Sequence, residues 1–348
     1  MSFRRFLYLV ANDGCAVHRG YSLHRIDTSR FFFRWSTEGI RAPLDSSGGA
    51  GAAADPSAVE DGGRLPDPVI NLCPPHLGPH RDGWISFVLF KNEGNDEGHD
   101  KVVAMDNTGS SLMCGPDVPP TVRYMPSLCY KFAPFSLTVG DSLYVMDALP
   151  KPPNCRGQHN FELPSPRIDS YAVVAGASIA VSNNASAQTF LFDTANRTWS
   201  KAGGWVLPFA RLAEYLPQHR LWFGVSPIED GYRFCATNLV AWPDSGEMTR
   251  PPVVHGLWRE PPPKWRPAEC YAVHLGSSRF CIVRFFVIVG DPVHGCPDPG
   301  CCPRIQVEEE LQAVVTGVEV ESCGDELRVV KHKSERYKLE LDHEYQVL

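Results

Sequence analysis

The sequence predicts an all-β chain, and the distribution of its proline, glycine and apolar residues is the reason. The chain holds 31 prolines and 29 glycines, a density of helix-breaking residues that long helices do not tolerate. Between these residues lie short apolar runs rich in Val, Ile, Phe, Tyr and Trp, which favour strands. The runs cover residues 87–90, 143–146, 178–181, 189–192, 221–225 and 279–283.

The composition is that of an ordinary globular protein. Of the 348 residues, 43% are hydrophobic and 21% are charged. The formal net charge of -7 argues against a nucleic-acid partner, because nucleic-acid-binding proteins usually present a basic face. No apolar run approaches the roughly 18 residues of a membrane-spanning helix. We therefore expect a monomer that binds neither membrane nor nucleic acid.

The beginning of the chain indicates a strand rather than an export signal. The apolar run 6–10 follows Arg4 and Arg5 and is cut by Asn12 and Asp13, whereas a signal peptide stays apolar and ends at small residues. The 12 cysteines among 348 residues are far below the density of cysteines in disulfide-stapled secreted domains. We expect a cytoplasmic or nuclear protein whose cysteines are free thiols.

One segment, residues 171–203, has the pattern of a four-stranded unit. Strands are expected at 171–174, 179–181 and 190–192, with a fourth beginning near residue 199. Parts of this unit recur along the chain, and four-stranded units at a spacing of about 40–50 residues are typical of propeller blades. We predict one propeller-like domain over residues 1–348, with about six or seven blades. A β-sandwich-type protein with several sheets is the alternative.

Three residues have structural roles in this predicted blade. Gly176 ends the first strand in a tight turn. Asp193 is expected to accept backbone N–H groups in the turn after the third strand. Trp199 offers a large flat surface, which we expect to pack against the neighbouring blade.

Two segments interrupt the strand pattern. Residues 44–67 are rich in Ser, Gly and Ala and are predicted to form a disordered insertion. Residues 290–304 are predicted to form an irregular Cys/Pro-rich loop. This loop contains residues of the types that bind zinc, but two of its cysteines are adjacent and no second C-x-x-C pair exists. We assign no metal and no cofactor, and leave open whether the loop binds metal through His294, Cys296, Cys301 and Cys302.

Residues 173–209 resemble a kelch-type blade, through Val173-Val174-Ala175-Gly176, Phe190-Leu191-Phe192-Asp193, Trp199 and Leu207-Pro208. More widely, the chain is similar to a large plant family, abundant in grasses, of kelch-like and F-box-associated type. The resemblance implies a kelch-like β-propeller and a conserved domain of unknown function, with no established catalytic residue and no substrate. The landmarks that match lie at residues 4–10, 22–32, 198–209, 213–217, 274–282, 316–320 and 330–337.

Two functions remain open from the sequence. The first is a non-catalytic protein-interaction scaffold, because loops on a rigid frame are where binding sites usually lie. Its protein partner is unknown. The alternative is an enzyme with a pocket in the propeller channel, similar to kelch-like oxidases that hold copper with Tyr and His. No G-x-x-x-x-G-K-[ST], H-E-x-x-H or G-x-S-x-G motif occurs, so we name no catalytic residue and expect the chain not to be an enzyme.

Overall fold

The computed structural model describes residues 3–13, 20–32, 59–78, 83–91, 100–115, 120–128, 131, 133–149, 167–239, 261–293, 306–323 and 326–348. Within these residues the protein is all-β, as the sequence predicts, and no sheet closes into a barrel. Helical structure there is limited to short 3-10 turns, η1 (Thr28–Phe31) and η3 (Ile228–Asp230). No helix of the described residues is long and apolar enough to cross a membrane.

The strands form five hydrogen-bonded sheets. The first sheet contains strands from both ends of the chain. Its strands lie in the order β22 (His343–Val347), β1 (Phe6–Asp13), β2 (Gly20–Asp27) and β4 (Pro68–Leu72). The second consists of β5 (Ile85–Phe90), β6 (Lys101–Asp106), β7 (Ser111–Cys114) and β8 (Val122–Met125). The third is the hairpin β9 (Pro134–Val139) and β10 (Ser142–Asp147).

The fourth sheet has seven strands, because two antiparallel groups meet at the parallel pair β11–β15. One group is β11 (Ser170–Val174), β12 (Ser178–Asn183), β13 (Gln188–Asp193) and β14 (Thr198–Gly203). The other is β15 (Ala210–Leu216), β16 (Leu221–Val225) and β17 (Phe234–Thr237). The fifth sheet contains β18 (Trp265–Gly276), β19 (Arg279–Val293), β20 (Gln306–Cys323), β21 (Glu326–Leu339) and β3 (Glu60–Arg64).

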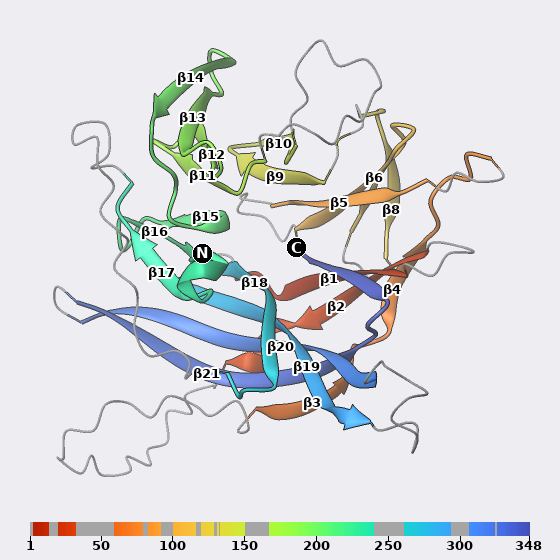
Figure 1. Ribbon diagram of the computed structural model, residues 1–348. Helices are drawn as coiled ribbons and strands as arrows, with labels where there is room; N and C mark the ends of the chain where they lie inside the picture. Colours follow the sequence, from red (N-terminus) through yellow and green to blue (C-terminus); the bar gives the residue numbers. More distant parts are fainter. Residues whose placement is uncertain are drawn as a thin grey trace.

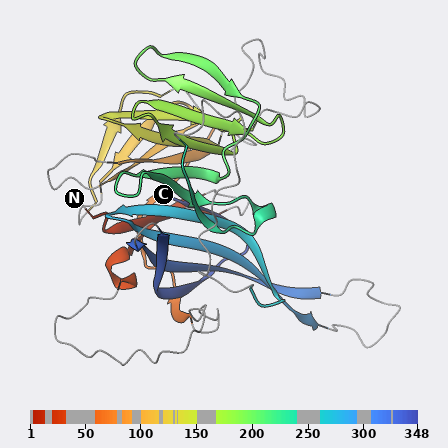
Figure 2. The ribbon, with the colours of Figure 1, turned by 90° about the vertical axis from the view of Figure 1, so that its left-hand side faces the viewer.

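These groups of strands follow one another around the centre of Figure 1 in the order of the chain, and the C-terminus lies near that centre. In the perpendicular view, β11–β14 lie at the opposite end of the molecule from the long strands β19–β21 (Figure 2).

Several strands bury both faces, which explains why the sequence shows continuous apolar runs rather than strict alternation. In β1, Leu7 and Leu9 enter one core cluster while Tyr8 and Val10 enter another. Successive side chains of a strand point to opposite faces, so a strand with a sheet on each side needs apolar residues throughout. The same division occurs in β5, β12 and β19.

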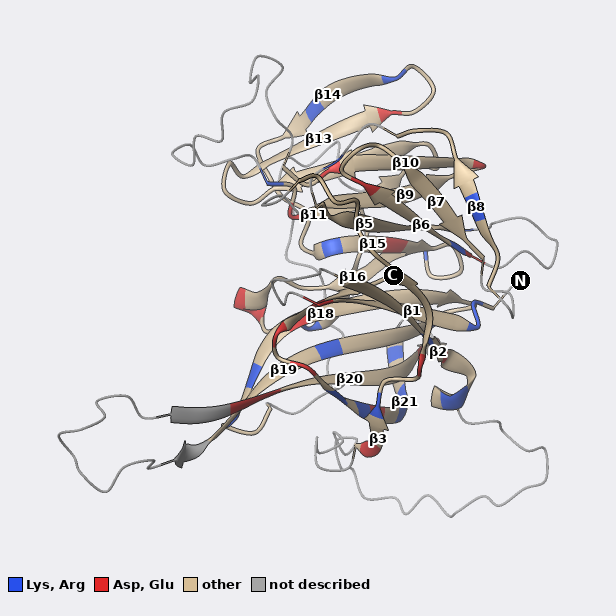
Figure 3. Ribbon diagram, turned by 90° about the vertical axis from the view of Figure 1, so that its right-hand side faces the viewer, with Lys and Arg blue, Asp and Glu red and all other residues tan. Residues whose placement is uncertain are grey.

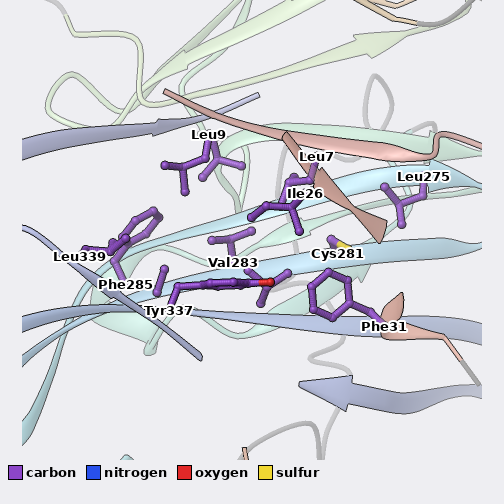
Figure 4. Packing of buried hydrophobic residues seen from close by; sticks show 13 residues of the cluster. Leu7, Leu9, Ile26, Phe31, Leu275, Cys281, Val283, Phe285, Tyr337 and Leu339 are labelled. Carbon is purple, nitrogen blue, oxygen red and sulfur yellow. The ribbon is translucent and has the colours of Figure 1, made fainter. Parts of the chain in front are cut away.

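The buried apolar residues of the described chain form six clusters, each between groups of strands that are neighbours in chain order. Moving along the chain, the clusters join β1–β2 to β5–β6, β5–β6 to β10, and β9 to β12. The next two join β11–β12 to β15–β17 and β15–β17 to β18–β20. The last returns from β18–β21 to β1, β2 and β22. Figure 4 shows this returning cluster, in which Leu7, Leu9 and Ile26 lie opposite Cys281, Val283 and Tyr337.

The predicted insertion at 44–67 is corrected at its C-terminal end. Residues 60–64 form β3, which pairs in parallel with β21, and Glu60 meets Lys333 at 2.8 Å. A segment with little to bury is ordered here because the open edge of β21 supplies hydrogen-bond partners for its backbone. Residues 44–58 lie outside the described residues.

The predicted irregular loop at 290–304 is corrected at its N-terminal end. Residues 290–293 continue β19, with Pro292 opposite Val307 and Val293 opposite Gln306 in β20. Residues 294–304 lie outside the described part of the chain.

Candidate functional site

Gly176 lies in a turn between two strands, and Asp193 is the last residue of a strand. Ala175 and Gly176 have φ of 50° and 72° in the tight turn between β11 and β12. Two successive left-handed residues are typical of a type I′ hairpin turn, where glycine is favoured. Asp193 ends β13, and its carboxylate accepts the backbone N–H groups of Ala195 at 2.8 Å and Asn196 at 3.0 Å.

A second aspartate, Asp106, occupies the corresponding position at the end of β6. Its carboxylate accepts the backbone N–H groups of Thr108 at 2.8 Å and Ser110 at 2.9 Å. Carboxylates that cap a turn in this way compete with the extended strand and stop it. The aspartate that ends a strand is therefore a local signal that recurs in two sheets.

The expectation that Trp199 packs against a neighbouring sheet is not met within the described residues, where this side chain belongs to none of the core clusters. Trp199 is 52% exposed and lies in β14, the edge strand of its sheet. Its recorded ring contact is with Phe192 of the adjacent strand, at a centroid distance of 5.0 Å. The buried tryptophan of this region is Trp222, which is 3% exposed and donates its indole N–H to the carbonyl of Val173 at 2.7 Å.

The possible metal ligands of the Cys/Pro-rich loop, His294, Cys296, Cys301 and Cys302, lie outside the described residues. Within the described ranges, no group of three or more His, Cys, Asp or Glu side chains is placed to hold a metal ion.

The candidate site is a cavity of about 910 Å³ that is lined by charged and aromatic side chains. Its lining comes mainly from β5, β9, β11, β15, β18 and β22, and Trp222 of β16 also contributes. The sequence search did not identify this cavity, because its lining residues are spread over most of the chain. Charged residues of both signs occur on β15, as Figure 3 shows.

One part of the cavity contains a network of charged groups. Lys91, just after β5, forms an ion pair with Glu214 of β15. Arg4 bonds to Asp100 at 3.1 Å and to the main-chain oxygen of Leu348 at 2.7 Å. Arg4 thus connects Leu348, the residue after β22, with Asp100, the residue before β6.

Protonation in this network follows from burial and charge. Burial acts to raise the pKa of Glu214, but Lys91 and its neighbours outweigh that effect and hold the pKa below its ordinary value. Burial lowers the pKa of His274 to about 4, and its buried Nε2 atom has no hydrogen-bond partner among the described residues. At neutral pH, Glu214 is therefore ionised and His274 is neutral.

A second polar group in the cavity is centred on Arg211 of β15. Its guanidinium lies 3.2 Å from the carboxylate of Glu269 and 4.6 Å from the ring centroid of Tyr271. Tyr271 donates its hydroxyl proton to the same oxygen of Glu269 at 2.5 Å. Burial acts to lower the pKa of Arg211, but Tyr271 and Glu269 outweigh it and raise the pKa. The guanidinium of Arg211 therefore keeps its positive charge at the cavity.

Tyr171 of β11 completes this region. Its ring stacks on Phe135 of β9 at a centroid distance of 4.0 Å and an interplanar angle of 22°. Burial raises the pKa of Tyr171 to about 12, so its hydroxyl stays protonated at neutral pH. Arg211, Tyr171 and Tyr271 all line the cavity.

Comparison with known families classifies the chain. A family model described as "Protein of unknown function (DUF1668)" matches residues 4–163 and 147–337. The chain belongs to the DUF1668 family. No curated protein and no solved structure matches it significantly. In this DUF1668 protein, the matched residues include Arg4, Lys91, Arg211 and Glu214, so the match covers the main charged residues of the cavity.

Sequence reasoning missed the functional candidates of this DUF1668 chain, although one signal was present. Arg211 and Glu214 stand within a short strand whose other residues are mostly apolar. Charged residues inside such a strand indicate that part of it faces a polar environment. This signal does not reveal the ion-pair partners of Glu214 and Arg211, because Lys91 and Glu269 come from distant segments of the chain.

Proposed function

We propose that this chain is a non-catalytic protein-interaction scaffold with the architecture of a six-bladed, kelch-like propeller. The blades are the four sheets that contain β1, β5, β9 and β18, together with the two halves of the seven-stranded sheet. The resemblance to kelch-like and F-box-associated plant proteins supports the same architecture.

The order of the core clusters supports this proposal. Each group of strands packs against the group before it and the group after it, and the last packs against the first. Radial packing of small sheets around an axis produces this cyclic order and leaves only short open edges. Pairing of β22 with β1 places both ends of the chain in one sheet, which favours a closed ring.

The observation that carries the functional proposal is the convergence of six strands on one cavity. A frame held by six cores is rigid, and its turns and open edges are free to vary without loss of the fold. Exposed aromatic residues on outer strands suit a protein partner, since Trp and Tyr are enriched at interface hot spots. Tyr124 of β8 is 93% exposed, and Trp199 of β14 is 52% exposed.

Affinity capture with matched variants tests the scaffold. The tagged full-length chain, Trp199→Ser and Tyr124→Ser are incubated with lysate from the source organism, and bound proteins are identified by mass spectrometry. Leu341→Ser changes another exposed apolar residue, one that does not line the cavity, and serves as the control. We expect a partner retained by the wild type and the control but lost from an aromatic variant, with direct binding after purification. Identical capture by all four chains would contradict a partner site on these edges.

The oxidase-like alternative concerns the same cavity and stays a prediction. Kelch-like oxidases hold copper with Tyr and His, and four tyrosines line this cavity: Tyr171, Tyr215, Tyr232 and Tyr271. Metal analysis of the purified chain separates the two functions. Stoichiometric copper that is lost in Tyr271→Phe would favour the oxidase.

The cellular setting is part of the proposal. We propose a monomer in the cytoplasm or nucleus, where thiols stay reduced. The described cysteines Cys73, Cys114, Cys235, Cys270 and Cys281 are free thiols, which fits that setting.

A further inference from the structure

Arg211 stands in a distorted stretch of β15. Its φ is 68°, in the left-handed region that residues with a side chain rarely adopt. The pairing of β15 with β16 changes register between Ala210 and Glu214, and the distorted stretch pairs instead with β11. Bulges that redirect a side chain occur frequently beside functional sites, and backbone strain concentrates there.

The facing strand accommodates this distortion through Gly224. A Cβ atom at this position would lie 2.9 Å from Cδ1 of Phe209 and 3.2 Å from the carbonyl oxygen of Leu212. Glycine at residue 224 therefore allows the close approach of the distorted segment. Both strands thus contribute to the geometry that directs Arg211.

Arg211 retains the capacity to bind an anion. Its side chain is 43% exposed, and its recorded ion-pair partner is Glu269. A guanidinium has five N–H donors in a planar fork, so one carboxylate contact leaves donors for a second anion. Arg211 belongs to the described cavity lining, whereas Glu269 does not.

Aromatic surfaces and a further donor line the same cavity as the guanidinium. Phe135 and Tyr171 form a stacked pair, and Tyr271 lies beneath Arg211. The hydroxyl of Tyr171 has no recorded hydrogen bond within the described residues, and Arg211 is close enough to influence it electrostatically. A ligand that offers a flat ring and an anionic group would satisfy both features.

We propose that the cavity binds a small aromatic carboxylate, with the carboxylate held by Arg211 and the hydroxyl of Tyr171. The volume of about 910 Å³ suits such a ligand, since small-molecule pockets span about 300–1,000 Å³. The inference concerns a small ligand and does not rest on the proposed protein interaction, so either can fail alone.

Isothermal titration calorimetry with the full-length chain tests the site. The probes are 4-hydroxybenzoate and its neutral analogue 4-hydroxybenzamide. We expect saturable binding of the carboxylate with a Kd in the millimolar range or lower. The amide should bind at least about tenfold more weakly, because a charge-assisted hydrogen bond is lost. Arg211→Gln should weaken carboxylate binding by about tenfold or more.

Arg123→Gln is the matched control, because Arg123 is an exposed residue of β8 that does not line the cavity. Its affinity for 4-hydroxybenzoate should equal that of the wild type. Tyr171→Phe removes a single oxygen and should weaken binding severalfold, which keeps the test valid if Arg211→Gln does not fold. Equal affinity for acid and amide, unchanged affinity in Arg211→Gln or Tyr171→Phe, or no saturable binding of 4-hydroxybenzoate would each overturn the proposal.

Discussion

Leu9 of β1 is paired with Val347 of β22, although the two residues lie near opposite ends of the chain. Both side chains belong to the cluster that joins the fifth sheet to the first. Leu9→Ala should lower the free energy of unfolding by about 2–5 kcal/mol, because it leaves a cavity in a closed core. Urea unfolding measures the change. The exposed Leu341→Ala is the control, with an expected effect within about 0.5 kcal/mol; equal effects of the two would show that this pairing is dispensable.

Trp222→Ala and Trp199→Ala should differ strongly in stability. Trp222 is buried and donates a hydrogen bond, so its replacement should cost about 3–5 kcal/mol. Trp199 is half-exposed and mainly contacts Phe192, so its replacement should cost less than about 1.5 kcal/mol. Denaturant titration of both variants decides this. A larger loss for Trp199→Ala would place that side chain in a core.

Gly224→Ala should destabilise the protein by about 1–3 kcal/mol, the usual range for overpacking. The added methyl group meets Phe209 and the backbone oxygen of Leu212, and backbone cannot move aside easily. Gly20→Ala is the control, since a Cβ atom at that position meets nothing within 4 Å. Thermal melts compare the two variants, and equal melting temperatures would contradict the close approach of β15 to β16.

The carboxyl groups of Asp193 and Asp106 should titrate below the ordinary value for aspartate. The backbone N–H of Asn196 is the largest cause for Asp193. For Asp106, burial acts to raise the pKa, but the hydrogen bonds from Thr108 and Ser110 outweigh it. A lowered folded-state pKa means that both turns stabilise the fold above the ordinary carboxyl pKa and lose this contribution as pH falls through the folded value.

Carbon-detected NMR of the carboxyl groups measures both pKa values. Asn196→Ala removes a side-chain hydrogen bond at 2.8 Å and should raise the pKa of Asp193 while leaving Asp106 unchanged. An unchanged titration of Asp193 would show that this bond is absent in solution.

Thiol reactivity should follow burial. Burial raises the pKa values of Cys235, Cys270 and Cys281 to about 12, and the thiolate is the reactive form. Iodoacetamide should modify the exposed Cys73 in the native protein and reach these three only after unfolding. Peptide mass spectrometry gives the order of modification. Rapid native labelling of Cys281, or a disulfide at any of the four, would contradict the structure.

The sequence by itself determined the features that depend on neighbouring residues. Apolar β-branched and aromatic runs between prolines and glycines predict the strands, because strand formation responds to local composition. The turn at Gly176 and the strand end at Asp193 are also readable, since the residues that stabilise a turn lie within it. The landmark segments also predict a family with a conserved domain of unknown function, and the chain belongs to the DUF1668 family.

Only the tertiary structure decided which strand lies at an edge and which side chains meet. Trp199 is exposed on β14, which ends its sheet among the described strands, whereas β3 is ordered because β21 offers it an open edge. The cavity brings Lys91 to Glu214 and Arg211 to Glu269, and each pair spans distant segments. Such contacts depend on how sheets pack and on a change of register in β15, and neither is encoded in the periodicity of one strand.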